Sequence, residues 1–285
     1  MVIDGRSVAA KITDQVKTRI KRLEFRPRLD TVLVGSDPAS QIYVNVKQRK
    51  CNELGIVNHV HRFSISTGEP ELVEFLQSLS IDEEVDGILL QLPVPQKYSA
   101  HRLLQCIDPA KDVDGLTYTN AGKLITGNPD TIIPCTAAGI LELCDQYRIE
   151  LAGKHACVIG RSNLVGRPVS RLLEGRNATV TLCHSKTKNL AAITRMADIL
   201  IVAAGSPRLL TGEMIPEDAV VFDVGINRIG SRIVGDVDFE TARKRCSYLT
   251  PVPGGVGPMT VAMLIKSLYS MALRRRTLDK IPILA

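Results

Sequence analysis

Apolar residues in the first half of the chain repeat with two different periods. Short runs rich in Val, Ile and Leu predict strands, and stretches with an apolar residue every three or four positions predict helices. The predicted strands span residues 31–34, 57–63 and 85–91, and the predicted helices span 8–23, 40–54 and 69–79. Strands that alternate with helices in this way form a parallel sheet through right-handed crossovers. The first half therefore predicts an α/β domain.

The second half repeats the alternation after a break. Residues 108–127 are first polar and turn-rich and then show little periodicity, so we place the crossover between domains there. Beyond it, strands are predicted over 154–159, 179–183, 197–204 and 219–225, with helices over 137–147, from 168 onward and over 259–274. The chain is thus expected to form two three-layer α/β domains.

A glycine turn joins the first strand of the second half to its helix. Gly160 follows the strand, Gly166 comes six residues later, and Pro168 suits the first helical turn. Gly160 permits unusual backbone angles, and Gly166 is expected to let the backbone approach a ligand. The amides and the positive end of the helix dipole would favour a phosphate. The spacing is not Gly-x-Gly-x-x-Gly, so a plain tight turn remains an equal alternative.

Composition narrows the partners and the compartment. The chain has 285 residues, no Trp and a net charge of +6, but its Lys and Arg residues are dispersed without interleaved aromatic residues. Anionic small molecules are therefore expected as partners, and nucleic acid is not. Seven cysteines without a Cys-x-x-Cys pair argue against disulfides and zinc sites. Short apolar runs and the lack of a signal-peptide core predict a cytoplasmic protein without a membrane partner.

Two histidines alternate on the predicted strand 57–63. His59 and His61 would share one face of that strand, but no third ligand stands near them in the sequence. We therefore interpret them as an ordinary exposed face and expect no metal.

Polar residues in the first half suggest proton chemistry. Tyr43 and Lys47 are four residues apart on one helix, so they are neighbours. A surface pair is the simpler interpretation, whereas a partly buried amine beside a phenol could transfer protons. Gln91 ends a strand, where ligands of α/β sheets collect. Asp112 and Asp114 alternate, so one could brace the loop while the other faces a ligand, and the sequence does not choose.

The end of the strand 179–183 bears on the choice of cofactor. An acidic residue at the corresponding position selects NAD, because it accepts the ribose hydroxyls and repels a 2′-phosphate. Here the segment 184–188 reads His-Ser-Lys-Thr-Lys and contains no carboxylate. With Arg161 in the glycine turn, NADP is favoured over NAD.

These motifs, in this order, resemble the bifunctional methylenetetrahydrofolate dehydrogenase/methenyltetrahydrofolate cyclohydrolase family over nearly the whole chain. The resemblance rests on Pro-Ala-Ser at 38–40 with Tyr-Val-Asn-Val-Lys at 43–47, Gln-Leu-Pro-Val-Pro at 91–95, Lys-Asp-Val-Asp-Gly at 111–115 and Pro-Val-Pro-Gly-Gly-Val-Gly-Pro-Met-Thr at 251–260. The turn residues 160–162 and 165–168 fit the family's cofactor turn. The resemblance implies a folate-binding catalytic domain (residues 1–115 plus 259–285) and a Rossmann-like NADP-binding domain (residues 116–258). It also implies a cleft between them, with the final helix packed on the first domain.

The resemblance also implies roles for individual residues. Lys47 would be the essential catalytic residue, with Tyr43 near the pterin, Gln91 hydrogen-bonded to Lys47 and Asp114 on the amino edge of the pterin. The remaining implied contacts are Gly160, Arg161, Ser162, Ser185 and Ile226 to NADP, and Pro253, Gly254, Gly255, Val256 and Gly257 to the folate.

The implied reactions are oxidation of 5,10-methylenetetrahydrofolate and hydrolysis of the methenyl product to 10-formyltetrahydrofolate, by a homodimer. Two alternatives stay open: a relative with dehydrogenase activity alone, and a non-catalytic nucleotide-sensing module. The intact Tyr43, Lys47, Gln91 and Asp114 favour the bifunctional enzyme over both.

Overall fold

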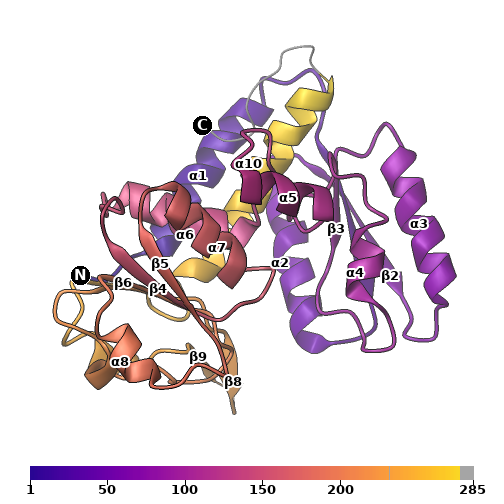
Figure 1. Ribbon diagram of the computed structural model, residues 1–285. Coiled ribbons are helices and arrows are strands. Elements are labelled where there is room, and N and C mark those ends of the chain that lie inside the picture. The colour runs from indigo at the N-terminus through magenta and orange to yellow at the C-terminus, as the bar shows by residue number, and fades with distance from the viewer. Residues whose placement is uncertain (231, 277–285) are drawn as a thin grey trace. The chain divides into compact units, whose positions relative to one another are not determined.

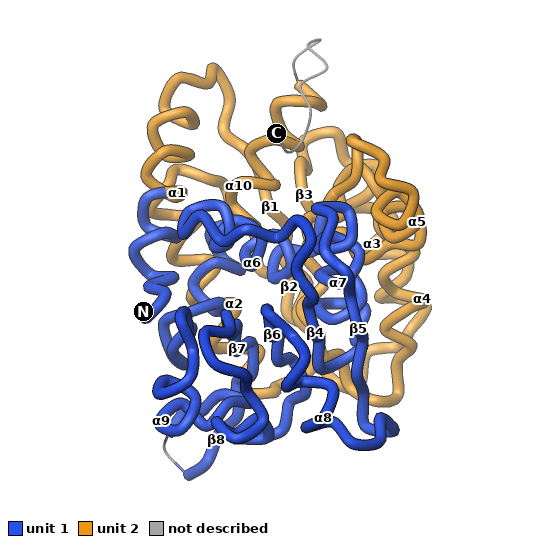
Figure 2. Tube along the Cα trace, turned by 60° about the vertical axis from the view of Figure 1, so that its left-hand side comes forward, with its two compact units in different colours: residues 1–11, 133–263 blue, residues 12–132, 264–285 orange. Residues whose placement is uncertain are grey.

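The computed structural model describes residues 1–230 and 232–276, which form two compact units. We name the units after the half of the sequence that forms most of each. The rear unit comprises residues 1–11 and 133–263 (blue in Figure 2), and the front unit comprises residues 12–132 and 264–285 (orange), of which 277–285 lie outside the described residues. These bounds differ from the expected 1–115 plus 259–285 and 116–258. The N-terminal residues belong to the rear unit because Ile3 pairs with the backbone of Leu249. Residues 116–132 belong to the front unit, where Asn120 and the amide of Thr117 bond to Asp112.

The front unit is built on a parallel sheet of three strands. These are β1 (Arg28–Val34), β2 (Val57–Phe63) and β3 (Gly87–Leu90), in the order β2-β1-β3. β1 is the central strand and all six of its residues from Leu29 to Val34 are buried. Because the chain leaves β1 on one side and returns on the other, the carboxyl ends of β1 and β3 form a switch point, where α/β sheets bind ligands. This confirms the predicted parallel α/β architecture.

Helices cover both faces of this sheet. They are α1 (Gly5–Ile20), α2 (Pro38–Leu54), α3 (Glu69–Ile81), α4 (Ala100–Leu104) and α5 (Tyr118–Thr126). α2 and α3 lie on opposite faces (Figure 1). Apolar residues of α3 such as Leu72 and Leu76 pack on Val32 and Ile88 and form the core on that face.

α5 corrects the expectation of an irregular segment after residue 117. Thr117 caps the helix by accepting a hydrogen bond from the amide of Asn120, and Gly127 ends it in the left-handed conformation. These two caps stabilise a helix of nine residues that is too short to show a clear apolar period.

The rear unit contains a parallel sheet of five strands. They are β4 (His155–Ile159), β5 (Thr179–Cys183), β6 (Ile199–Val202), β7 (Val220–Asp223) and β10 (Tyr248–Leu249), in the order β10-β7-β6-β4-β5. The strand β5 lies on one side of β4, and the strands that follow it in the chain, β6, β7 and β10, lie on the other side. The switch point therefore lies beside the carboxyl end of β4, as in Rossmann-like folds.

Short elements complete the rear unit. Helices α6 (Cys135–Gln146) and α7 (Gly166–Gly175) lie on one face of the sheet and α8 (Leu190–Thr194) on the other (Figure 1). The chain also forms the 3₁₀ turn η1 (Gly212–Met214), the antiparallel pair β8 (Asn227–Ile229) and β9 (Arg232–Val234), and α9 (Phe239–Ala242).

The last helix, α10 (Val256–Arg276), begins in the rear unit and ends in the front unit. Leu268 packs where a side chain on Gly87 of β3 would otherwise lie, and Arg276 forms an ion pair with buried Asp86. The helix is long and apolar enough to cross a bilayer by length and composition alone, but 56% of that window is buried in the structure. It is a core helix that packs on the front unit, as the resemblance implied.

Candidate functional site

Lys47 lies on the buried side of α2. Asp37 caps the helix by accepting the amide proton of Ser40, Pro38 follows the cap, and Gly55 ends the helix in the left-handed conformation. The buried positions of the helix recur at helical spacing and include the lysine: Ser40, Val44, Lys47, Cys51 and Leu54. Lys47 is only 8% exposed, whereas Tyr43, one turn earlier, is 37% exposed. The structure thus excludes a surface ammonium at Lys47.

Gln91 holds the amine of Lys47 at the carboxyl end of β3. The Nζ atom of Lys47 donates to Oε1 of Gln91 at 3.1 Å, which is the predicted hydrogen bond. Gln91 is itself fixed, because its Nε2 donates to the carbonyl of Leu92 at 2.7 Å and its amide donates to Val32 of β1. Among residues 1–230 and 232–276, no carboxylate forms an ion pair with Lys47. The amine is thus held by the neutral amide of Gln91.

Burial changes the acidity of two neighbours of Lys47 on α2. Burial raises the pKa of the Cys51 thiol to about 12, although the charge of Lys47 opposes this shift. Burial also raises the pKa of the Tyr43 phenol. Both groups therefore stay protonated and uncharged at neutral pH.

The structure resolves the ambiguity between Asp112 and Asp114. Asp112 is buried and accepts hydrogen bonds from the amide of Thr117 at 2.8 Å and from Nδ2 of Asn120 at 3.0 Å, so it braces the loop. Burial raises the pKa of its carboxyl against these hydrogen bonds. Asp114 is half-buried and remains the candidate for contact with a ligand.

In the rear unit, Gly160 ends β4 and opens the turn toward α7. Its φ of +118° is unfavourable for other residues, and a Cβ atom there would lie 2.1 Å from the carbonyl oxygen of Ala203. A Cβ atom on Gly166 would lie 1.8 Å from the oxygen of Gly160. Gly166 therefore lets the helix pack against the turn itself, and its approach to a ligand stays a prediction.

The residues of the turn fit a dinucleotide with an additional phosphate. Arg161 and Ser162 are exposed in the turn between β4 and α7, and Ser185 is exposed beyond β5, close to Lys186 and Lys188. The described residues 160–163 and 184–188 include no carboxylate. Ile226, also predicted to contact the cofactor, is 50% exposed between β7 and β8 and offers an apolar surface.

Two aspartates that the sequence did not single out brace the loops of the same sheet. Asp223 at the end of β7 accepts hydrogen bonds from the amides of Gly225, Asp236 and Val237. Asp236 accepts from the amides of Ala204 and Gly205 beyond β6. Burial raises the pKa of Asp223 to about 6, with Asp236 adding to the shift. The sequence signal that could have identified Asp223 is its place as an acidic residue at the end of the apolar strand β7.

The loop 253–257, predicted to contact the folate, opens α10. Gly254 has a φ of +117°, and its carbonyl accepts the amide proton of Arg6. A Cβ atom on Gly5 would lie 1.9 Å from the oxygen of Gly255, so the loop packs closely on the start of α1. Pro253 is exposed, Gly254, Gly255 and Val256 are buried, and Gly257 is partly buried. Within the rear unit these glycines therefore have a packing role.

The structure places a carboxylate beside the two histidines. Asp30 on β1 lies next to both His59 and His61, although it is distant from them in the sequence. The pairing of β1 with β2 brings together residues that are 29 positions apart or more.

The two units together define a nucleotide-dependent α/β enzyme with a Rossmann-like dinucleotide-binding unit and a second unit that holds a buried amine. Comparison with known proteins assigns the family. The model of the tetrahydrofolate dehydrogenase/cyclohydrolase catalytic domain matches residues 3–114, and the model of the NAD(P)-binding domain matches residues 134–276. The chain belongs to the tetrahydrofolate dehydrogenase/cyclohydrolase family.

Individual relatives agree over nearly the full length. The bifunctional protein FolD of Halothermothrix orenii is 50% identical over 270 residues, which cover 93% of this chain and 95% of the relative. The crystal structure of bifunctional FolD from Campylobacter jejuni has a TM-score of 0.95 at 44% identity and covers 96% and 99% of the two chains. The Trypanosoma brucei enzyme, solved with NADP and an inhibitor, has a TM-score of 0.92 at 37% identity and covers 96% and 97%. The predictions of fold class, bifunctional enzyme and NADP as cofactor are confirmed.

Proposed function

We propose that Lys47 is the catalytic residue with which this chain converts 5,10-methylenetetrahydrofolate to 10-formyltetrahydrofolate. The enzyme oxidises the methylene carbon with NADP and then hydrolyses the methenyl product. The observation that carries the proposal is the buried amine of Lys47, hydrogen-bonded to Gln91 at the carboxyl end of β3. A site of this kind combines a proton carrier with a fixed orientation.

The hydrolytic step needs a residue that moves protons. Water adds to the methenyl carbon and loses one proton, and the hydroxyl group so formed loses the second proton as it becomes the formyl oxygen. One carbon–nitrogen bond of the five-membered ring breaks in that change, and the nitrogen released by that bond takes up one proton. The overall change releases one proton. The Nζ atom of Lys47 would accept the proton of the water and return one to the leaving nitrogen. Gln91 accepts a hydrogen bond from the same Nζ and keeps it aimed during both transfers.

The other predicted substrate residues would orient the folate. Tyr43 is half-exposed and stays a neutral phenol, so it offers a ring face to the pterin without adding charge. Asp114 would accept hydrogen bonds from the amino edge of the pterin. The loop of Pro253, Gly254, Gly255, Val256 and Gly257 would border the folate.

The rear unit would hold NADP. When bound, NADP supplies the acceptor for the hydride of the methylene carbon. Gly160 and Ser162 would offer backbone and hydroxyl groups to the phosphates, and Arg161 with Ser185 would bind the 2′-phosphate. Ile226 would cover an apolar face of the cofactor.

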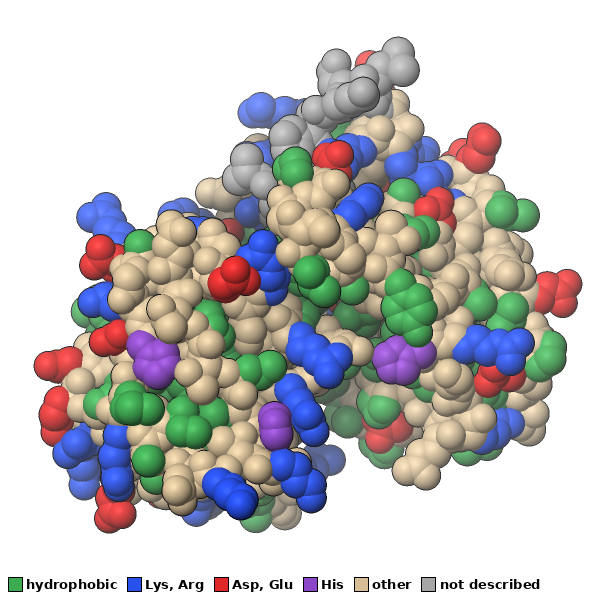
Figure 3. Space-filling model, viewed as in Figure 1, with side chains coloured by type: hydrophobic (Ala, Val, Ile, Leu, Met, Phe, Trp, Pro, Cys, Tyr) green, Lys and Arg blue, Asp and Glu red, His purple; other side chains and the backbone are tan. Residues whose placement is uncertain are grey.

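The proposed enzyme is a cytoplasmic homodimer that acts on small anionic molecules. Both basic and acidic side chains appear on the visible face (Figure 3), and the Lys and Arg residues are dispersed along the sequence without interleaved aromatic residues, which favours small substrates over nucleic acid or a membrane surface. Light scattering during gel filtration should give twice the chain mass of 31.1 kDa. A mass of a single chain would contradict the dimer and leave the catalytic proposal intact.

Replacing the lysine tests the catalytic proposal. Lys47→Met retains a long apolar side chain without the amine, so cyclohydrolase activity should fall by about a hundredfold or more while folate binding stays measurable. Lys50→Met, on the same helix, removes a partly exposed lysine paired with Glu53 and should leave both activities unchanged. Normal hydrolysis in Lys47→Met would refute the role of Lys47.

One assay separates the proposed function from its rivals. Absorbance of reduced nicotinamide is followed after methylenetetrahydrofolate is added with NADP or with NAD. Reduction of NADP followed by appearance of the formyl product supports the bifunctional enzyme, and reduction without hydrolysis identifies a dehydrogenase alone. No signal with either cofactor would favour the nucleotide-sensing module.

A further inference from the structure

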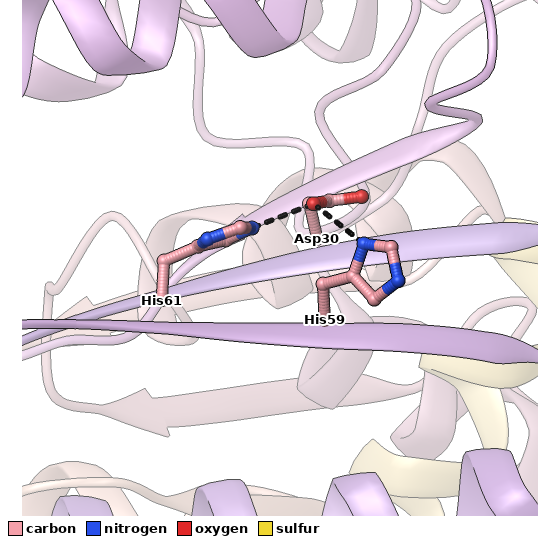
Figure 4. A group of neighbouring side chains, drawn as sticks. All are labelled: Asp30, His59 and His61. Atoms are coloured by element: carbon pink, nitrogen blue, oxygen red, sulfur yellow. Dashed lines mark hydrogen bonds and ion pairs between the residues drawn. The ribbon is translucent and has the colours of Figure 1, made fainter.

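A histidine pair and an aspartate form a cluster on the sheet of the front unit. Asp30 on β1 is the direct neighbour of His59 on β2, and His61 lies two residues further on, opposite Val32. Alternate residues of a strand point to the same face, so His59 and His61 project together. Oδ1 of Asp30 lies 2.6 Å from Nε2 of His61 and 3.6 Å from Nδ1 of His59 (Figure 4).

The cluster faces away from the amine of Lys47. Arg62, which alternates with the two histidines, donates to Asn45 of α2 and so points to the face that carries Lys47. His61 instead packs on Phe75 of α3, with ring centroids 4.8 Å apart, on the opposite face. A ligand at the cluster is therefore separated by the sheet from the proposed chemistry.

The donor atoms match a transition-metal ion. Two imidazole nitrogens and a carboxylate oxygen lie within 4.8 Å of one another. Zinc with three protein ligands and one water has bonds of about 2.0–2.2 Å, which place tetrahedral donors about 3.3–3.6 Å apart. The 3.6 Å separation lies at the upper end of this range, and the 2.6 Å separation would have to open by rotation of the His61 side chain. A bound ion would occupy Nε2 of His61, and the ring would then carry its hydrogen on Nδ1.

The surroundings orient the ligands and leave them accessible. Nε of Arg28 donates to the other oxygen of Asp30 at 2.7 Å, which fixes the carboxylate in the way that outer partners orient metal ligands. Arg28 also reaches Oδ1 at 3.2 Å and would have to yield that contact, and Asp82 at 3.2 Å is available to hold its guanidinium. The side chain of His59 is 51% exposed and that of Asp30 is fully buried, so an ion can enter from solvent toward a rigid carboxylate.

We propose that Asp30, His59 and His61 bind one divalent ion of the zinc class and that this ion ties the edge strand β2 to β1. The site is independent of the folate and NADP sites. Ligands that bind only the folded state stabilise it, so Zn²⁺ should raise the melting temperature.

Metal titration of the full chain without a histidine tag tests the proposal. Calorimetry with Zn²⁺ should give one ion per chain, and Co²⁺ should give the visible absorption of a tetrahedral site with imidazole ligands. His59→Gln and His61→Gln should each weaken binding by about tenfold or more, and the double variant should lose the Co²⁺ bands and the thermal shift. His101→Gln removes an exposed histidine of α4 in the same unit and should bind as the wild type does.

The outcomes separate the proposal from nonspecific binding and from misfolding. Binding that persists in the double variant, or that is lost in His101→Gln, would overturn the site, as would no binding at about 1 mM Zn²⁺. The side chain of His59 is 51% exposed and that of His61 is 27% exposed, so their replacement should leave the front unit folded. Circular dichroism of the variants checks this. Normal dehydrogenase activity of the double variant without metal is expected, because the cluster lies on the other face of the sheet.

Discussion

Lys47 and Gly160 both lie near the switch point of a parallel sheet, but they form their sites by different means. In the front unit the functional group is one side chain, placed by the buried stripe of α2 and held by Gln91. In the rear unit it is backbone, shaped by a positive φ at Gly160 and by contact between the turn and Ala203. We therefore expect substitutions in the front unit to affect chemistry more than folding, and those in the rear unit to affect both.

The largest effect should come from Gly160→Ala. The added Cβ atom would lie 2.1 Å from the oxygen of Ala203, at a φ of +118°. Strain and the forced movement of backbone should lower the free energy of unfolding by about 2–4 kcal/mol and abolish measurable NADP binding. Chemical denaturation and fluorescence titration with NADPH measure the two effects.

Gly153→Ala is the matched control for that variant. Gly153 also has a positive φ, of +75°, but nothing lies within 4 Å of its Cβ position. It should therefore lose only about 1 kcal/mol from backbone strain and bind NADP normally. Equal losses in the two variants would show that the contact with Ala203 contributes nothing.

The dependence of stability on pH should differ between the two units. The fold raises the pKa of Asp223 in the rear unit and lowers the pKa of Asp37 in the front unit. The pKa of Asp223 rises from 3.8 to about 6, so the folded rear unit holds its proton more tightly than the unfolded chain does. This group therefore stabilises the fold less as the pH rises from about 4 to about 6, by up to about 3 kcal/mol. Asp37, the cap of α2, has a lowered pKa, so its contribution is present at neutral pH and is lost as the pH falls below about 4.

Two variants test whether Asp223 and Asp37 cause these changes of stability with pH. Asp223→Asn should be less stable overall, because an amide matches the three bound amides poorly, but its stability should vary less between pH 4 and 6. In Asp37→Asn, the free energy of unfolding should change between pH 4 and 6 as it does in the wild type. Its dependence on pH should become weaker than in the wild type only below about pH 4. Denaturation curves at each pH measure both, and an unchanged slope in Asp223→Asn would contradict the assignment.

In the front unit, Gln91→Leu should reduce catalysis with little effect on folding. Lys47 would remain buried but would lose the oxygen that aims its amine. Cyclohydrolase kcat should fall about tenfold to a hundredfold with a smaller change in KM, because orientation matters most in the transition state. Gln96→Leu changes an exposed glutamine five residues later and should have no effect. A change in KM alone would indicate that Gln91 binds substrate and does not position Lys47.

Local sequence patterns predicted the elements better than they predicted which residues meet. The strand at 57–63 was predicted with its observed bounds, because Val57, Val60 and Phe63 recur among polar residues directly after the helix stop at Gly55. Asp30 and His61 could not be paired in advance, since their contact depends on the register of two parallel strands. Asp112 and Asp114 alternate in one short segment, and nothing in that segment tells them apart. Only the packing of the folded chain shows that Asp112 is buried and Asp114 is half-buried.

The smallest effect is expected from a side chain in the glycine turn between β4 and α7. Its replacement tests whether one side chain of this turn contributes to NADP binding. Arg161 is exposed in a turn whose shape depends on Gly160 and Gly166, so Arg161→Ala should leave stability unchanged. Loss of one charge-assisted hydrogen bond to the 2′-phosphate should raise KM for NADP about tenfold and leave KM for NAD unchanged. Arg171→Ala, further along α7, removes an arginine paired with Glu174 and should leave both constants as in the wild type. An equal rise for NADP and NAD would instead place Arg161 on the phosphates that the two cofactors share, and selectivity would then depend on Ser185 and the lysines beyond β5.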